Sequence, residues 1–310
     1  MLAMDWTLFV IQLLNGLQLG ILLFLLAAGL TLTFGIMDFI NLAHGSLYMV
    51  GAFLCATFTL WTDSFIIGLL LAVPVTALVG LVLEWTVIRH LYARDHLSHV
   101  LATFGLILVF DTLVHLIWGA DGFSIPLPDW LNGQLSITAD LVLPSYRVLI
   151  IVVGLALALG LYWLVNHTRL GMRIRAGASD RTMISALGVD IQLLFALVFA
   201  LGAAMAGVAG MLISPITEAS IGMGNEIIIT AFVVIIIGGI GSIKGAFVAA
   251  MLIGLIDTMG RSYLDDLFKL IMSVQAAETS APAVSAMLIY ILMACVLVFK
   301  PEGLFPPKTR

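Results

Sequence analysis

Long apolar stretches, each free of Asp, Glu, Lys and Arg, follow one another along the whole sequence. They occupy residues 6–37, 39–62, 64–83, 148–166, 191–217, 227–243 and 279–299. Two more stretches, 99–118 and 245–263, are apolar apart from a few polar residues. About 20 apolar residues cross a bilayer as a helix, and continuous rather than alternating apolarity excludes a membrane β-barrel. The pattern predicts an all-α integral membrane protein, a polytopic bundle of eight to nine transmembrane helices.

Composition agrees with this reading, since 62% of the 310 residues are hydrophobic and only 10% are charged. Soluble domains carry about 45–50% apolar and roughly 25% charged residues, so a soluble enzyme, a disordered chain and a coiled coil are excluded. Cys55 and Cys295 are too far apart in sequence to indicate a disulfide framework or a metal site. We expect a single transmembrane domain over residues 1–310.

Charged residues divide between two sets of connections. The basic residues form three segments, and an even number of spans lies between one segment and the next. The segments contain Arg89 and Arg94, then Arg169, Arg173, Arg175 and Arg181, and finally Lys300, Lys308 and Arg310. Acids, among them Glu218 and Glu226, dominate the alternate connections. The positive-inside rule therefore predicts a cytoplasmic loop at 166–190, a cytoplasmic tail at 300–310 and an outer loop at 119–147. If residues 35–45 form an inner turn, the amino terminus lies outside and the count is nine.

Two polar, glycine-rich segments, 34–46 and 238–245, interrupt apolar spans. Unwound backbone is tolerated in a membrane only where protein or water satisfies it, so such breaks are pointers to a transport path. Aligned on Gly45 and Gly245, the two segments also predict a remote internal repeat of broken helices. The alternative is close helix packing, which small residues at four-residue spacing favour equally.

Intramembrane acids have local partners available. Asp111 and His115 lie four residues apart, as do Asp257 and Arg261, and one helical turn brings such pairs together. Glu84 lies near enough to the predicted inner surface to meet Arg89 or the water. We predict that these pairs are structural, which argues against a proton-coupled carrier using several converging acids.

The sequence lacks the motifs that would indicate nucleotide binding or catalysis. The segment 239–245 resembles a phosphate loop, but Lys244 precedes Gly245 and Ala246 follows, whereas a P-loop ends in Gly-Lys-Ser/Thr. His-Glu-x-x-His and Gly-x-Ser-x-Gly do not occur in the sequence. We therefore predict no ATP site, no metal site and no enzymatic activity in this chain.

The predicted cytoplasmic loop contains a short helix signal. Ser179 is a candidate N-cap, Asp180 suits the first turn, and Gly188 ends an apolar run that covers residues 182–187. A short helix between two spans is suited to insert into the groove of a partner protein. The alternative is a positively charged topology anchor, which would need only the arginines.

Taken together, these segments resemble permease subunits of ABC importers of the branched-chain amino acid type, in particular the LivH type. The resemblance covers nearly the whole chain. In many such permeases a proline stands in the second break, where this chain has Lys244. The matching motifs are Gly29-Leu-Thr-Leu-Thr-Phe-Gly35, Ile40-Asn-Leu-Ala-His-Gly45 with Tyr48-Met-x-Gly51, Arg175-Ala-x-Ala-x-Asp180, Ala186-Leu-Gly-Val189, Gly202-Ala-Ala-Met-Ala-Gly-Val-Ala-Gly210, Gly238-Gly-Ile-Gly-Ser-Ile-Lys-Gly245 and Lys300-Pro-Glu-Gly-Leu-Phe305.

The resemblance implies a role for particular residues. The segment from Arg175 to Gly188 would be the helix that couples the chain to a cytoplasmic ATPase, with Gly177, Asp180 and Ala186 among its positions. The solute would pass near two groups of residues, one in each break: Asn41, His44, Gly45 and Tyr48, and Gly238, Gly239, Gly241 and Gly245.

The implied assembly lies in the bacterial inner membrane. Its other members would be a second permease subunit of the LivM type, two cytoplasmic ATPase subunits that bind the ATP, and a periplasmic solute-binding protein. Neither a cofactor in this chain nor a nucleic-acid partner is expected. The solute remains open between branched-chain amino acids and urea, amides or aromatic and organic acids. The rival from another class is an autonomous carrier coupled to H⁺ or Na⁺ through Asp111 and Asp257.

Overall fold

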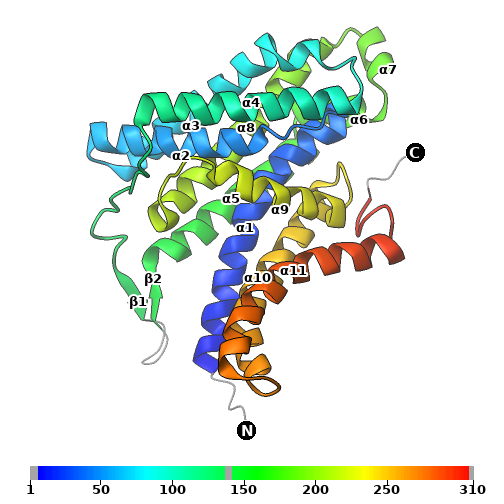
Figure 1. Ribbon diagram of the computed structural model, residues 1–310. Helices are drawn as coiled ribbons and strands as arrows, with labels where there is room; N and C mark the ends of the chain where they lie inside the picture. The colour runs from blue at the N-terminus through cyan, green and yellow to red at the C-terminus, as the bar shows by residue number, and fades with distance from the viewer. Residues whose placement is uncertain (1–5, 137–141, 307–310) are drawn as a thin grey trace.

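The computed structural model describes residues 6–136 and 142–306, so Lys308 and Arg310 of the predicted tail lie outside the described residues. Within these ranges Figure 1 shows a bundle of helices with one small β-hairpin. In chain order the elements are α1 (Trp6–Met37), α2 (His44–Thr62), α3 (Phe65–Thr86), η1 (Ile88–His90), α4 (His96–Trp118), β1 (Gln134–Ser136), β2 (Val142–Pro144), α5 (Ser145–His167), α6 (Arg169–Ser179), α7 (Arg181–Ala186), α8 (Ile191–Thr217), α9 (Met223–Gly238), α10 (Ile243–Lys269) and α11 (Val274–Phe299). The strands β1 and β2 pair antiparallel within the predicted outer loop.

Eight of the described helical segments are long and apolar enough to cross a membrane, namely α1, α2, α3 with η1, α4, α5, α8, α10 and α11. A ninth, α9, is equally apolar but has 16 residues. The prediction of a polytopic all-α membrane protein with eight to nine spans is therefore confirmed. Helices form because unbroken apolar runs have no other way to satisfy their backbone in lipid.

The helices α6 and α7 mark one end of the bundle, which we call the basic end. A Cβ placed on Gly177 of α6 would lie 3.3 Å from the side chain of Leu194, at the start of α8, and 3.7 Å from that of Ile36, at the end of α1. The last turn of α1 and the first turn of α8 therefore meet at the basic end.

The β-hairpin marks the opposite end, which we call the hairpin end. The Tyr146 hydroxyl, at the start of α5, donates a 2.6 Å hydrogen bond to the carbonyl of Leu212 in α8. The neighbouring Arg147 donates a hydrogen bond to the side chain of Asn15 in α1. The first half of α1 and the second half of α8 thus lie together at this end. It follows that α1 and α8 run antiparallel.

The chain contains an inverted repeat, in which α1–α4 corresponds to α8–α11. α1 is followed by Asp38 (φ 51°) and α8 by Glu218 (φ 68°), both in the left-handed region. After a short non-helical segment, α2 and α9 each have glycine as their second residue, and these residues, Gly45 and Gly224, contact each other. α3 packs on α8 as α10 packs on α1. The repeat was predicted from aligning Gly45 with Gly245, whereas the structure matches Gly45 with Gly224.

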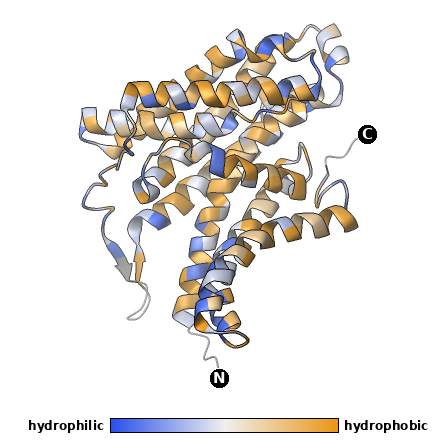
Figure 2. Cartoon of the chain, viewed as in Figure 1, coloured by the Kyte–Doolittle hydropathy of each residue, from blue (hydrophilic) through white to orange (hydrophobic). Residues whose placement is uncertain are grey.

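Burial separates central from peripheral helices. Of the residues in the most apolar 18-residue stretch of each helix, 83% are buried in α1 and 78% in α8, but only 11% in α11 and 17% in α4. Figure 2 shows the apolar colour continuing over the outward faces of these peripheral helices. A soluble protein would bury such faces, so they belong against lipid or another membrane subunit.

Two predicted local ion pairs are present. The carboxylate of Glu84, which is fully buried, lies 3.1 Å from the guanidinium of Arg89 and also accepts a 2.9 Å hydrogen bond from the hydroxyl of Tyr92. Asp257 and Arg261 form a 2.9 Å pair one turn apart on α10. Both predictions are confirmed, and both acids have structural partners.

Candidate functional site

The break between α1 and α2, residues 38–43, turns back into the bundle. The ring of His44, the first residue of α2, lies beside Gly29 of α1, because a Cβ there would come within 2.8 Å of its Nε2. Gly29 lies eight residues before the end of α1, or about 12 Å along its axis. The N–H of Leu42 donates a 3.3 Å hydrogen bond to Thr103 Oγ1 and ties the break to α4. α2 therefore begins inside the bundle and not at its surface.

Three polar side chains at this entry form what we call the buried polar group: Asn41, His44 and Ser46. Each is at most 1% exposed. Over the part of the chain that is described, the side chains of Asn41 and Ser46 have no hydrogen-bond partner. Neither ring nitrogen of His44 meets hydrogen-bond geometry, although the ring lies near the backbone of Leu26. Leaving a buried polar group unpaired costs about 1–3 kcal/mol, so a concentration of them indicates a role other than stability.

The starts of α2 and α9 meet at two glycines. A Cβ on Gly45 would overlap the carbonyl oxygen of Gly224, and a Cβ on Gly224 would overlap that of Gly45. Only glycine allows this backbone approach. The first N–H groups of a helix lack intrahelical acceptors and carry partial positive charge. Two half-helix N-termini that meet within a membrane are a typical arrangement for holding an anionic or carbonyl group of a solute.

Acidic residues flank this meeting point. Asp111 Oδ2 accepts a 3.0 Å hydrogen bond from Asn225 Nδ2 in α9. The predicted pairing of Asp111 with His115 is wrong, because the packing of α9 supplies a partner that sequence spacing does not reveal. Glu226 was placed in an outer loop, yet it lies exposed in the first turn of α9, within electrostatic reach of Tyr48. Figure 2 shows a hydrophilic patch at the start of α9 among apolar surroundings.

The second glycine-rich break connects α9 to α10 at the basic end. Gly241 packs against Gly35 near the end of α1, and Gly238 packs against Gly245 across the turn. Gly35 lies six residues beyond Gly29, or about 9 Å along α1. The structure therefore does not bring this break together with the buried polar group.

The C-terminal tail covers that second break. The N–H groups of Leu304 and Phe305 donate hydrogen bonds of 2.8 Å and 3.0 Å to the carbonyls of Ile237 and Gly238. Lys244 lies 5.1 Å from the centre of the Phe305 ring, in cation–π geometry. The last carbonyls of α9, which a helix end leaves unpaired, are thus satisfied by the tail.

The predicted coupling segment forms two helices, α6 and α7. Asp180 is the N-cap of α7, since its carboxylate accepts a 2.9 Å hydrogen bond from the N–H of Met183. The prediction that Ser179 caps this helix is therefore wrong by one residue; Ser179 is the last residue of α6. Gly188 follows α7 with φ 84°, the left-handed conformation predicted by its position as a stop signal.

Contacts anchor α6 and leave α7 projecting. Arg175 donates a hydrogen bond to the carbonyl of Val165 in α5, and Gly177 is buried against α1 and α8. By contrast, Ala186 and Gly188 are exposed, and a Cβ on Gly188 would meet nothing within 4 Å. The end of α7 is therefore an open surface.

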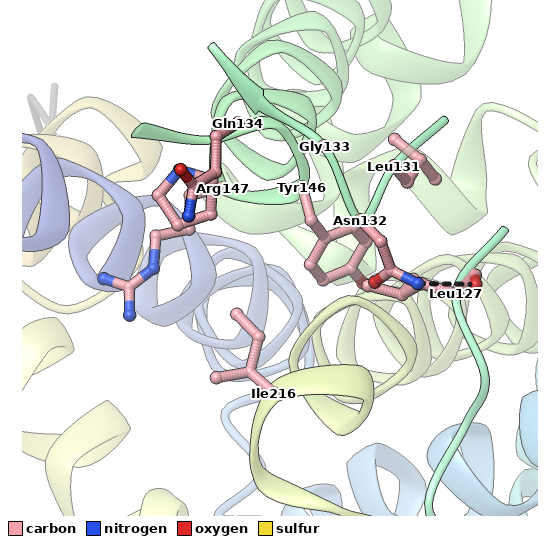
Figure 3. A pocket seen from close by; sticks show the side chains of 9 residues that line it. Leu127, Leu131, Asn132, Gly133, Gln134, Tyr146, Arg147 and Ile216 are labelled. Atoms are coloured by element: carbon pink, nitrogen blue, oxygen red, sulfur yellow. Dashed lines mark hydrogen bonds between the residues drawn. The ribbon is translucent and has the colours of Figure 1, made fainter. Parts of the chain in front are cut away.

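A shallow hollow of about 200 Å³ lies at the hairpin end, and Figure 3 shows its lining. The side chains of Tyr146 and Arg147 already bond to α8 and α1 there, and Asn132 donates a 3.1 Å hydrogen bond to the carbonyl of Leu127. These three side chains are thus partnered within the chain.

An inverted repeat with half-helices that start inside the bundle, and a helix projecting from the basic end, define the class of a membrane transport subunit. A sequence profile of the family described as "Branched-chain amino acid transport system / permease component" matches residues 12–297. The chain belongs to this family.

Individual relatives agree over most of their length. The chain is 31% identical to the high-affinity branched-chain amino acid transport system permease protein BraD of Pseudomonas aeruginosa over 94% of both chains. It is 29% identical to LivH, the permease protein of the same kind of system in Escherichia coli K12, over 86% of this chain and 90% of LivH. No solved structure matches. The resemblance to the LivH type drawn from the motifs is confirmed.

Proposed function

We propose that this chain is one of two permease subunits of an ATP-driven importer for branched-chain or related amino acids in the bacterial cytoplasmic membrane. Its partners are a second permease subunit of the LivM type, two cytoplasmic ATPase subunits that bind the ATP, and a periplasmic solute-binding protein. The chain holds no cofactor, and no covalent step takes place in it. The observation that carries the proposal is the meeting of two half-helix N-termini at Gly45 and Gly224 in a member of this permease family.

The basic end faces the cytoplasm in this proposal, because arginines concentrate in α6 and α7. Met183 and Leu187, four residues apart at α7, are 60% and 76% exposed and project as two apolar anchors. An amphipathic helix with anchors at this spacing suits an apolar groove of a partner. Since Gly177 is wedged beside α1 and α8, a displacement of α7 reaches the two central helices.

Alternating access follows from that connection. When ATP draws the ATPase subunits together, α6 and α7 move, and the antiparallel pair α1 and α8 carries the starts of α2 and α9 with it. The path runs between this chain and the second permease subunit, past Asn41, His44, Gly45 and Tyr48. The turn formed by Gly238, Gly239, Gly241 and Gly245 lies nearer the cytoplasmic mouth. Exposed backbone, small residues and few charges suit a zwitterionic solute.

A secondary carrier and an importer of other solutes are the alternatives to this proposal. An autonomous ion-coupled carrier that used Asp111 together with Asp257 would need both acids, but Asp257 is already paired with Arg261 on α10. Urea, amides and aromatic or organic acids are the remaining solutes. A ligand screen of the cognate binding protein separates them directly.

The assembled importer in proteoliposomes tests the proposal. With ATP enclosed on the ATPase side and leucine-loaded binding protein on the other, we expect leucine uptake that stops without ATP. The purified chain alone should accumulate nothing. Accumulation by the chain alone under an ion gradient would establish the carrier reading instead.

Two substitutions separate the coupling and path roles. Gly188→Trp forces a bulky residue into a left-handed conformation beside α7, so we expect ATP hydrolysis without uptake in a complex that still assembles. Normal uptake by this variant contradicts the coupling role. His44→Ala should impair uptake more than it impairs binding of the ATPase subunits, and unchanged uptake would make His44 a packing residue.

A further inference from the structure

Glu226 is a carboxylate without an ion-pair partner at membrane depth. It is exposed, and none of the ion pairs among the described residues includes it. Its neighbour Asn225 bonds to Asp111, which lies seven residues inside the hairpin end of α4, or about 10 Å along the helix. A charge at this depth is so costly against lipid that such residues face a cavity, a path or another subunit.

A second, independent observation lies beside Glu226. Tyr48 is only 6% exposed, and across the described residues its hydroxyl makes no hydrogen bond. The phenol lies within electrostatic reach of Glu226. The hydroxyl oxygen is not among the fully buried polar atoms, so it is open to a group that approaches Glu226.

Groups of both electrostatic signs occur at the starts of α2 and α9. Glu226 and Asp111 supply negative charge. The N-termini of α2 and α9, which touch at Gly45 and Gly224, supply partial positive charge. The buried polar group, with unpaired donors on Asn41 and Ser46, stands at the start of α2. This arrangement complements a molecule that carries an ammonium and a carboxylate on adjacent atoms.

We propose that Glu226, assisted by Asp111 and Tyr48, binds the ammonium group of a zwitterionic amino acid in transit, while the joined starts of α2 and α9 receive its carboxylate. The proposal rests on the proposed function and deepens it. Organic acids and urea lack the cation that Glu226 would bind. The site therefore selects amino acids among the solutes that the family resemblance leaves open.

The test uses the complete importer with its binding protein in proteoliposomes. We expect Glu226→Gln to lower leucine uptake about tenfold or more, because the amide of Gln can still accept a hydrogen bond but lacks the negative charge that pairs with the ammonium group. Assembly with the second permease subunit and ATP hydrolysis should persist. Glu226→Asp, which keeps the charge, should recover part of the uptake. The matched control is Glu278→Gln at the start of α11, another exposed glutamate, which should transport normally.

Each outcome decides the question. Unchanged uptake in Glu226→Gln overturns the proposal. Loss of the second permease subunit from the purified variant also overturns it, since Glu226 would then pair with a cation of that subunit. A failure of the unsubstituted importer to transport any amino acid contradicts the proposed function itself, before a variant is compared.

Discussion

The two breaks that the sequence singles out differ in how their polar groups are satisfied. At the break before α2, the side chains of Asn41 and Ser46 are buried without partners in the described structure, and the backbone at Gly45 lies against the backbone of Gly224 in α9. At the break before α10, the C-terminal tail supplies donors to the carbonyls of Ile237 and Gly238. The first break leaves hydrogen-bonding capacity unused, whereas the second uses it within the chain.

This difference would distinguish a break that the solute uses from a break that is structural. Glycines, polar neighbours and an apolar helix afterwards are common to both segments, so composition does not distinguish them. What distinguishes them is whether another part of the same chain completes the hydrogen bonds. We infer that the unpaired polar groups at the break before α2 are available to the solute. The break before α10 is a turn that the C-terminal tail fixes by hydrogen bonds.

The largest effect is expected at the backbone contact of the first break. Gly45→Val places a branched side chain where the carbonyl of Gly224 lies, so α2 and α9 must separate. We expect uptake to be abolished and the complex to lose thermal stability, because overpacking costs about 1–3 kcal/mol or more. Uptake assays and thermal unfolding of the purified complex measure both.

A matched control for this change is available in α5. A Cβ on Gly160 would meet nothing within 4 Å, so Gly160→Ala should lower neither uptake nor stability. If Gly45→Val behaved like this control, the close contact of the two half-helices would be of no consequence.

In the buried polar group, a substitution should raise the stability of the complex and lower its uptake. Asn41→Leu replaces an amide that lacks partners with an apolar side chain of similar size. We expect the complex to gain up to about 1–3 kcal/mol in stability while uptake falls about tenfold, since the penalty of the unpaired amide disappears. Uptake and thermal unfolding measured on one preparation check this. A loss of stability in parallel with uptake would mean that Asn41 is structural.

At the second break the effect should fall on stability alone. Gly239 has φ 101°, and a Cβ there would lie 3.0 Å from the carbonyl oxygen of Glu302 in the tail. Gly239→Ala should therefore cost about 1–3 kcal/mol while uptake at low temperature stays near normal. Gly105→Ala in α4, where an added Cβ is free, is the control. A strong loss of uptake at unchanged stability would place Gly239 in the path.

The smallest effect concerns the Lys244 contact. The cation–π geometry with Phe305 is worth about 0.5–1 kcal/mol at an exposed site. Lys244→Gln and Phe305→Ala should each destabilise the complex slightly, and the double variant by less than their sum. Strict additivity in this double-mutant cycle would show that the two side chains do not interact.

The long apolar runs carried most of the fold, because lipid leaves helices as the sole option for α3, α5 or α11. The role of Gly188 as a helix stop and the pairing of Glu84 with Arg89 could likewise be predicted from the sequence, since each depends on residues that are close together in the chain. The position of the start of α9 inside the bundle could not be predicted in this way. Glu226 precedes an apolar run as a loop acid would, and the hydropathy pattern does not show that the chain turns back after α8.

The site required information from distant parts of the sequence. Asp111 has His115 one turn away but bonds to Asn225, 114 positions later, because the start of α9 comes within hydrogen-bonding distance of α4 at this residue. One signal was present: Gly222 and Gly224 stand directly before Asn225 and Glu226, and glycines beside polar residues at the head of an apolar run mark a re-entrant helix start.

The contact between Gly45 and Gly224 also has a consequence for how the protein is made. During synthesis, α2 leaves the ribosome long before α9 exists, so the polar first turn of α2 enters the membrane without the backbone surface that will cover it. The first turn of α2 therefore stays uncovered until α9 has been made. Release of a nascent chain that ends before α9 should leave α2 open to degradation, which makes completion of the second half a checkpoint for the first.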